Sequence, residues 1–355
     1  MIVKKKVLHL FFIIILIQCK SFAQSIQYPS PAKVNTDLHK ILDRPKVDPR
    51  PQFERIANDS VIIERGSIYT EQNERVPILI YKPISKVEKA FPVVVFLHGT
   101  GGNKDAANTR NVLYQLTKRG FMGVAIDARF HGARVPGGAH SSKEYVEAAT
   151  RAWENTDPAK QTHPFLWDTA YDLWRLVDYL VTRPDVRANC IGMSGTSMGG
   201  IETWMAASVD TRIKVAVLNI AAQSFKWSLD NDKWQGRAHT IQGTHLQAAK
   251  ELGDSTLNKR NVKAVWDKLL PGITGEFDCP SMIRLFAPRP LLILSNENDE
   301  NCPLPGAKIA YKLAEAEYEK VHASSRLTMD IAPKLKHMET PEHLKMTLDW
   351  FEKWL

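Results

Sequence analysis

A serine flanked by glycines forms the turn that most constrains how this chain can fold. Residues 195–200 read Gly-Thr-Ser-Met-Gly-Gly and stand between a strand-like and a helix-like stretch. A strand that turns abruptly into a helix leaves no room for side chains two residues before or after its apex, and Gly195 and Gly199 meet that requirement. The apex residue is strained and presents its side chain outward. We therefore expect Ser197 to be an exposed nucleophile on such a turn.

Short β-rich runs alternate with helical patterns from residue 61 onward. The run at 93–97, Val-Val-Val-Phe-Leu, is apolar at every position, which is typical of a strand covered on both faces. This alternation predicts the α/β class, with a mostly parallel sheet and helices on both faces. Residues 221–288 interrupt the pattern and predict a cap-like insertion over one end of the sheet. We expect strands at 76–81, 93–97, 122–126, 190–194, 213–220, 291–295 and 327–331, and helices at 107–119, between 168 and 184, and at 201–207, 307–321 and 344–355.

The amino-terminal residues have the features of an export signal. Residues 1–23 begin with three consecutive lysines at 4–6, followed by a short apolar core and the small-residue pattern Ser-Phe-Ala at 21–23, which together are typical of a cleaved signal peptide. An apolar core this short argues against a membrane anchor, and no later stretch approaches the length needed to span a bilayer. We expect a secreted or periplasmic protein cleaved before Gln24. The weaker alternative is a lipoprotein attached through Cys19.

Composition narrows the classes of partner. The formal net charge of +8 falls to +4 without the four lysines of the signal, and the remaining charges are mixed along the chain, so we expect no nucleic-acid partner. The rest of the chain is long enough for one large domain. Residues 24–60 contain five prolines and are expected to form an irregular leader, followed by a catalytic domain at 61–355.

The cysteines give little indication of a structural role. After the signal, Cys190, Cys279 and Cys302 remain, an odd number without the close spacing of a metal site, so neither a metal centre nor a disulfide scaffold is expected. A single bridge between Cys279 and Cys302 is compatible with an oxidising compartment, and two unpaired thiols are equally compatible with the sequence.

Two residues in later loops complete the chemistry that Ser197 requires. A serine hydroxyl is a weak nucleophile and needs a base, which in turn is oriented by a carboxylate. In a parallel sheet, such groups come from loops at the carboxyl ends of the strands. Asp299 and His337 each follow an expected strand, so we predict a triad of Ser197, His337 and Asp299. Glu297 lies earlier in the same turn as Asp299, and His343 lies in the last helix, where we expect it to face solvent.

The oxygen that becomes negative during acyl transfer also needs hydrogen-bond donors. The loop at 98–102, His-Gly-Thr-Gly-Gly, follows the central strand and lacks the Gly-Lys-Ser/Thr ending of a phosphate-binding loop. We predict that the backbone N–H groups of Thr100 and Met198 form the oxyanion hole. The loop at 127–132, Asp-Ala-Arg-Phe-His-Gly, is expected to fix its neighbours by hydrogen bonds, and its His131 is a weaker candidate for the pocket.

The order of these motifs resembles that of the α/β-hydrolase superfamily. The resemblance covers roughly residues 60–355 and is strongest to the serine esterase branch that joins dienelactone-hydrolase, acetyl-xylan-esterase and prolyl-oligopeptidase-type catalytic domains. It implies an α/β-hydrolase fold and a serine carboxylesterase without a cofactor or metal, acting on a small-molecule or carbohydrate ester. The segments that carry it beyond the triad are 165–169 (Phe-Leu-Trp-Asp-Thr), 231–235 (Asn-Asp-Lys-Trp-Gln), 287–291 (Ala-Pro-Arg-Pro-Leu) and 337–341 (His-Met-Glu-Thr-Pro).

Two other functions are compatible with these motifs. A serine peptidase of the prolyl-oligopeptidase type would use the same triad, although the leader at 24–60 is too short for the propeller that restricts access in those enzymes. A non-catalytic binding protein on a hydrolase scaffold would not need a complete triad. Trp153, Trp227 and Trp234 predict either a stacking surface for sugar or aromatic groups, or ordinary packing.

Overall fold

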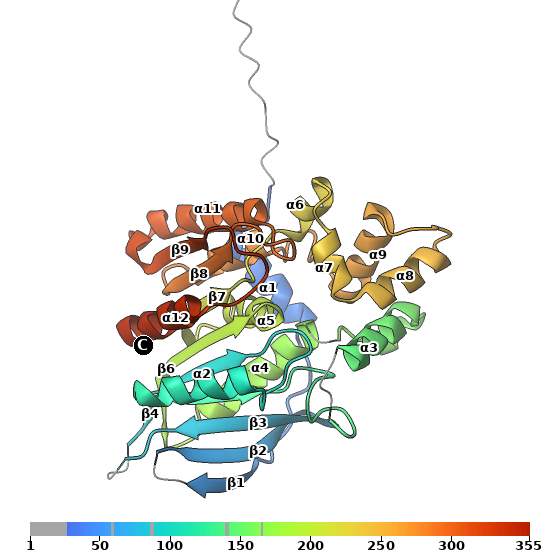
Figure 1. Ribbon diagram of the computed structural model, residues 1–355. Coiled ribbons are helices and arrows are strands. Elements are labelled where there is room, and N and C mark those ends of the chain that lie inside the picture. Colours follow the sequence, from blue (N-terminus) through green and yellow to red (C-terminus); the bar gives the residue numbers. More distant parts are fainter. Residues whose placement is uncertain (1–26, 58–59, 86–88, 139–141, 165) are drawn as a thin grey trace, which may run out of the picture.

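The computed structural model describes residues 27–57, 60–85, 89–138, 142–164 and 166–355, so the expected signal at 1–23 lies outside the described residues. Within this part, nine strands form one sheet in the order β1-β2-β3-β5-β4-β6-β7-β8-β9 (Figure 1). Strands β4 to β9 are parallel, and β1 to β3 add an antiparallel edge. The strands are β1 (Gln52–Ala57), β2 (Ile62–Glu71), β3 (Glu74–Lys82), β4 (Phe91–Leu97), β5 (Met122–Ile126), β6 (Val186–Thr196), β7 (Ile213–Asn219), β8 (Leu291–Asn296) and β9 (Leu327–Ala332).

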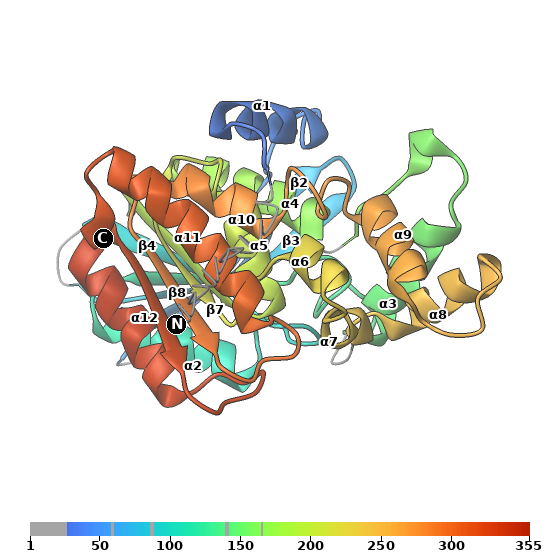
Figure 2. The ribbon, with the colours of Figure 1, turned by 90° about the horizontal axis from the view of Figure 1, so that it is seen from above.

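Helices cover both faces of the sheet, as Figure 2 shows. Helices α4, α5 and α11 lie on one face, and α2 and α12 lie on the other. None of the helices in the described ranges is long and apolar enough to cross a membrane. The helices are α1 (Pro31–Ile41), α2 (Ala107–Lys118), α3 (Lys143–Glu154), α4 (Leu166–Leu180), α5 (Met198–Ala207), α6 (Phe225–Asp230), α7 (Gln235–His239), α8 (Gln242–Glu251), α9 (Lys259–Leu269), α10 (Cys279–Met282), α11 (Leu304–Lys320) and α12 (Pro341–Trp354), with 3-10 turns η1 (Pro158–Lys160), η2 (Ile283–Phe286) and η3 (Ser324–Arg326).

Strand β4 shows why the central run is apolar at every position. Val93, Val95 and Leu97 pack into the core beneath α4 and α5, whereas Val94 and Phe96 pack into a second core beneath α2 and α12. All five side chains are buried. Because successive strand residues point to opposite faces, a strand between two helical layers needs an apolar residue at each position. The expected α/β architecture is thus confirmed.

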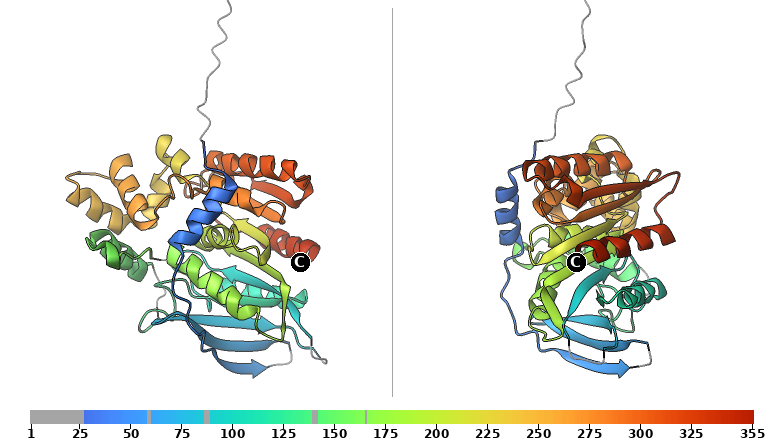
Figure 3. Two further views of the ribbon diagram at one scale, coloured as in Figure 1. Left: turned by 180° about the vertical axis from the view of Figure 1, so that it is seen from behind. Right: turned by 90° about the vertical axis from the view of Figure 1, so that its left-hand side faces the viewer.

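The segment before residue 61 is more regular than the sequence suggested. Ser30 accepts a hydrogen bond from the Lys33 amide (3.3 Å) and caps helix α1, which buries Val34 and Leu38. Figure 3 shows α1 on the outer side of the helices that cover this face of the sheet. Strand β1 pairs with β2 and extends the sheet. The expectation of an irregular leader over 24–60 is therefore wrong for these two elements, because both find tertiary partners.

The expected insertion at 221–288 forms a cap built mainly of α6 to α9. Helix α3, which the sequence reading left unassigned, completes it and lies beside α8 and α9 (Figures 1 and 2). The Trp153 indole donates to Glu251 (2.7 Å), which joins α3 to α8. Trp234 is buried and Trp227 is half-buried, so Trp153 and Trp234 serve in packing. Helix α10 and turn η2 return the chain to the sheet.

Candidate active site

Ser197 occupies the apex of a sharp turn between β6 and α5, as predicted. Its backbone has φ 55° and ψ −113°, a conformation that costs a non-glycine residue about 1–3 kcal/mol and is typical of functional sites. A Cβ atom on Gly195 would lie 2.3 Å from the carbonyl carbon of Gly199, and one on Gly199 would lie 2.3 Å from the Leu97 oxygen. Both contacts are too close for any side chain, so the two glycines permit the turn.

The structure brings Ser197, His337 and Asp299 together. Ser197 Oγ lies 2.7 Å from His337 Nε2, and His337 Nδ1 lies 2.7 Å from Asp299 Oδ2. The His337 side chain is 21% exposed, whereas that of Asp299 is 1% exposed. With the proton on Nδ1 donated to Asp299, Nε2 has a lone pair with which to accept the serine proton. The arrangement can therefore generate a serine alkoxide equivalent at the edge of solvent.

The turn after β8 fixes the Asp299 carboxylate. Asp299 Oδ1 accepts hydrogen bonds from the amides of Asn301 and Cys302, both at 2.8 Å. Glu297, the alternative acid, instead accepts from the Lys334 amide (2.7 Å) and is exposed. Because both oxygens of Asp299 are engaged, its carboxylate holds one orientation toward the imidazole.

His343 does not face solvent, contrary to expectation. Its side chain belongs to the buried face of α12, and neither ring nitrogen has a hydrogen-bond partner among the described residues. Burial lowers the pKa of His343, so the ring is held neutral. It plays no part in the constellation around Ser197.

Two polar side chains hold the loop that carries His337. Asn296, at the end of β8, donates to the carbonyl oxygens of Lys336 (2.5 Å) and Met338 (2.8 Å). Glu339 accepts from the hydroxyl of Thr196 (3.0 Å), the residue before Ser197. Its second oxygen accepts from the Asn219 amide at the end of β7 (2.6 Å). These contacts tie the histidine loop to the serine turn.

A small cavity of about 30 Å³ adjoins the serine turn. Thr100 and Met198, the predicted oxyanion pair, both line it. Among the described residues, neither backbone N–H donates to a protein acceptor, which leaves both available for a substrate oxygen. The remaining lining residues come from the cap, α3, α4 and α5, and are Tyr145, Leu166, Ile201, Phe225, Arg237, Thr240, Ile241, Trp266 and Leu270.

The two loop histidines, His98 and His131, are structural. His98 Nδ1 lies 2.8 Å from the Gly99 oxygen, and its Nε2 accepts from the Ala128 amide (3.2 Å). The His131 ring stacks on Tyr145 with centroids 4.9 Å apart. Burial lowers the pKa of His131 to about 3 and also lowers that of His98. Both rings are therefore neutral, and His131 is packed within the protein.

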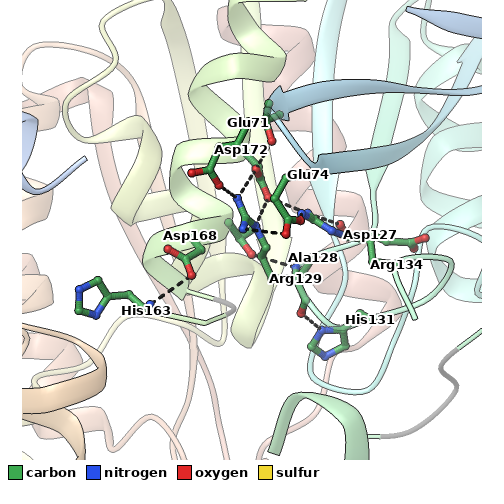
Figure 4. Close-up of polar contacts among 12 residues, drawn as sticks. Glu71, Glu74, Asp127, Ala128, Arg129, His131, Arg134, His163, Asp168 and Asp172 are labelled. Atoms are coloured by element: carbon green, nitrogen blue, oxygen red, sulfur yellow. Dashed lines mark hydrogen bonds and ion pairs between the residues drawn. The ribbon is translucent and has the colours of Figure 1, made fainter. Parts of the chain in front are cut away.

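The loop after β5 is fixed by a buried charge network, shown in Figure 4. Arg129 donates to Asp172 (2.8 Å) and to Glu71 (2.5 Å), and Arg134 donates to Asp172 (2.6 Å). Burial alone would raise the pKa of Asp172, but the two guanidinium groups outweigh it and hold that pKa well below its usual range. Asp127 accepts from the Lys104 amide (2.8 Å). The predicted loop-fixing role of Asp127 and Arg129 is thus confirmed.

The three cysteines in the described part of the chain are unpaired, so Cys279 and Cys302 form no disulfide. Asp299, Cys302 and His337 offer oxygen, sulfur and nitrogen atoms within 4.8 Å of one another. Burial raises the pKa of Cys302 to about 12, so it remains a thiol, and the other two atoms are engaged with each other. The donor set therefore fits a hydrogen-bonded acid–base pair better than a metal site.

The sequence did not predict three residues that lie around the site: Asn296, Glu339 and Arg237. Glu339 is part of the His-Met-Glu-Thr-Pro segment that carried the family resemblance, which is the one signal that pointed to it. Asn296 lies at the end of a correctly predicted strand. Arg237 lies in the insertion, where no pattern distinguishes a pocket-lining cation from a solvated one.

Comparisons with known proteins bear on the family and the fold. A model of the Abhydrolase family matches residues 20–349. The chain is 26% identical over 306 residues to "Putative hydrolase YtaP" of Bacillus subtilis (strain 168), covering 83% of this chain and 88% of that protein. It is 23% identical over 294 residues to "Putative esterase YitV" of the same organism, covering 80% and 98%. Acetyl Xylan Esterase 1 from Thermoanaerobacterium sp. JW/SL YS485 has the same fold, with a TM-score of 0.67 at 18% identity over 93% of this chain and 96% of that one.

Proposed function

The chain belongs to the Abhydrolase family, and on this premise we propose that it is a serine hydrolase of carboxylic esters. Ser197 is the nucleophile, His337 the general base and acid, and Asp299 the group that orients the imidazole. The observation that carries the proposal is the continuous relay of two 2.7 Å contacts from Ser197 Oγ through His337 to Asp299. The strained apex at Ser197 supports it independently.

The geometry supports a two-step reaction. Ser197 Oγ attacks the ester carbonyl carbon while its proton passes to His337 Nε2, and the carbonyl oxygen turns toward the amides of Thr100 and Met198. His337 then gives the proton to the departing alkoxide, and the alcohol leaves the acyl-enzyme. A water molecule, deprotonated by His337, attacks the acyl carbon and releases the acid. Asp299 stabilises the imidazolium in both steps.

The substrate class follows from size and from similarity. A cavity of about 30 Å³ beside Ser197 favours a short acyl group, because a single water already needs roughly 10–15 Å³ of such space. One fold neighbour is named an acetyl xylan esterase, which supports an ester of a carbohydrate. The basic and apolar pattern of residues 1–23 favours export, so we place the reaction outside the cytoplasm.

A Ser197→Ala variant tests the nucleophile. Hydrolysis of p-nitrophenyl acetate should fall on the order of 10⁵- to 10⁶-fold, as expected when a coupled triad loses its serine. Ser194→Ala is the matched control, because that buried hydroxyl on the same strand has no hydrogen-bond partner among the described residues. Near-wild-type activity of Ser197→Ala would overturn the assignment.

A substrate panel separates the esterase from its rivals. Acetylated oligosaccharides should be deacetylated, whereas peptide amides should remain intact. Faster cleavage of prolyl peptide amides than of esters would favour the peptidase alternative. Binding of acetylated sugars without turnover would favour a non-catalytic role.

A further inference from the structure

A buried guanidinium without an acidic partner faces the cavity beside Ser197. Arg237, on α7, lines this cavity together with Thr100 and Met198. It is only 7% exposed. Its Nη2 donates to Cys302 Sγ (2.9 Å), and its Nε lies 3.2 Å from the Gln223 side-chain oxygen when that amide is oriented to satisfy both of its neighbours. Among the described residues, Nη1 has no protein acceptor, and it is not fully enclosed by protein.

The Asp299 carboxylate does not neutralise this cation. Its two oxygens are held by His337 and by the amides of Asn301 and Cys302. No carboxylate of the described chain lies within ion-pairing distance of Arg237. A buried charge without a counter-ion is costly. The site therefore favours an anionic oxygen supplied from outside the protein.

The size of the cavity limits what that anion can be. Its volume of about 30 Å³ admits a group the size of a carboxylate, since a single water already needs roughly 10–15 Å³. Because the residues of the predicted oxyanion hole line the same cavity, the group bound there is attached close to the scissile carbonyl.

We propose that Arg237 selects esters whose short acyl part ends in a carboxylate, that is, half-esters of small dicarboxylic acids. The proposal rests on the proposed function and names the substrate class of the same site. The carboxylate pairs with Arg237 Nη1 and is unchanged by the reaction: water adds across the ester bond, and the alcohol and the dicarboxylic acid are released. Arg237 is a specificity-determining residue in this scheme, because it contacts the substrate away from the reacting atoms.

Two methyl esters of nearly equal shape test the proposal. Monomethyl malonate carries a carboxylate where methyl isovalerate carries an isopropyl group. We expect the wild type to show at least a tenfold higher kcat/KM for monomethyl malonate. Arg237→Met should lower the ratio of the two kcat/KM values tenfold to a hundredfold, and Arg237→Lys should keep part of it. The change in ratio cancels the difference in intrinsic reactivity of the two esters.

Controls separate failure of this inference from failure of the proposed function. Arg260→Met, at an exposed position in the same cap, should leave the ratio unchanged. If Arg237→Met still hydrolyses p-nitrophenyl acetate but leaves the ratio of the two kcat/KM values unchanged, the inference is overturned. If the wild type hydrolyses no ester, the proposed function fails instead. Should Arg237→Met not fold, monomethyl malonate should inhibit hydrolysis of p-nitrophenyl acetate by the wild type at least tenfold more strongly than methyl isovalerate does, and equal inhibition would refute the selection.

Discussion

Removing the Glu339 carboxylate should slow catalysis without unfolding the protein. Glu339 lies two residues after His337 and accepts hydrogen bonds from Thr196, beside the nucleophile, and from Asn219. It touches neither the nucleophile nor the base in this structure, so its role is to position the histidine loop against the serine turn. In a Glu339→Ala variant, the loop would still be held by Asn296 and Asp299.

The size of the expected fall in kcat follows from these two hydrogen bonds. A hydrogen bond to a charged acceptor contributes about 1.5–3 kcal/mol, and Glu339 is only half-buried, so the lower part of this range applies. If about 1.4–2.8 kcal/mol of the two contacts is expressed as alignment of His337, kcat falls tenfold to a hundredfold. Because Glu339 does not line the cavity beside the predicted oxyanion pair, KM should change little.

A pH series distinguishes positioning from a general loss of structure. Burial raises the pKa of Glu339 above its ordinary value, so the carboxylate is charged at pH 8 and becomes partly protonated as the pH falls. Glu339→Gln resembles the protonated acid, and the ratio of wild-type to variant kcat for p-nitrophenyl acetate should therefore narrow from pH 8 to pH 5. Glu342→Gln, at an exposed position in the first turn of α12, is the matched control. Wild-type kcat in Glu339→Ala, or a ratio independent of pH, would refute the reasoning.

Two further predictions concern stability. Gly195→Val should lose more than about 3 kcal/mol of unfolding free energy, since even a Cβ would lie 2.3 Å from Gly199. The control Gly275→Ala, whose Cβ would meet only an ordinary 3.7 Å contact, should have a melting temperature near that of the wild type. Equal melting temperatures for the two variants would contradict the steric argument. Burial lowers the pKa of His245 to about 4. As the pH falls through about 6.5, this histidine is therefore protonated in the unfolded chain but stays neutral in the folded protein, and the folded state loses stability. Between pH 7 and pH 5, urea titrations should show that the wild type loses about 2 kcal/mol more unfolding free energy than His245→Leu does. Parallel pH profiles of stability for the two proteins would count against this role of His245.

The sequence predicted the elements whose pattern is set by local sterics or by two-sided burial. The β4 run and the serine turn are of this kind, and both formed as expected. Helix α1 carried a readable signal, a serine cap followed by proline at the first helical position, which the neighbouring prolines obscured. Strand β1 is polar along much of its length (Gln-Phe-Glu-Arg-Ile-Ala), and only its pairing with β2 makes it a strand. His343 was misplaced because the buried face of α12 is decided by the sheet beneath it.

Within the candidate site, too, residues set by local patterns or by strand order were predictable, and residues set by long-range contacts were not. Ser197 is specified by five consecutive residues, whose glycines leave the chain few alternatives at that turn. Asp299 and His337 were found by counting strands, since the carboxyl ends of a parallel sheet bring separate loops together. Arg237 and Glu339 were not found, because their partners lie 65 and 143 residues away along the chain. No local pattern encodes such contacts.

The nucleophile and the base should tolerate substitution differently. The nucleophile depends on a backbone strain that a single turn imposes, so substitutions at its glycines should destroy the fold and the activity together. The base depends on a loop held from three directions: Asp299 fixes its ring, Asn296 its flanking carbonyls, and Glu339 its distance from the serine. Losing one of these supports leaves the other two, so activity should decline in steps while the fold persists. Substrate specificity rests on Arg237 in the cap, outside both the serine turn and the histidine loop. It is therefore the property most easily altered while the nucleophile and the base are kept.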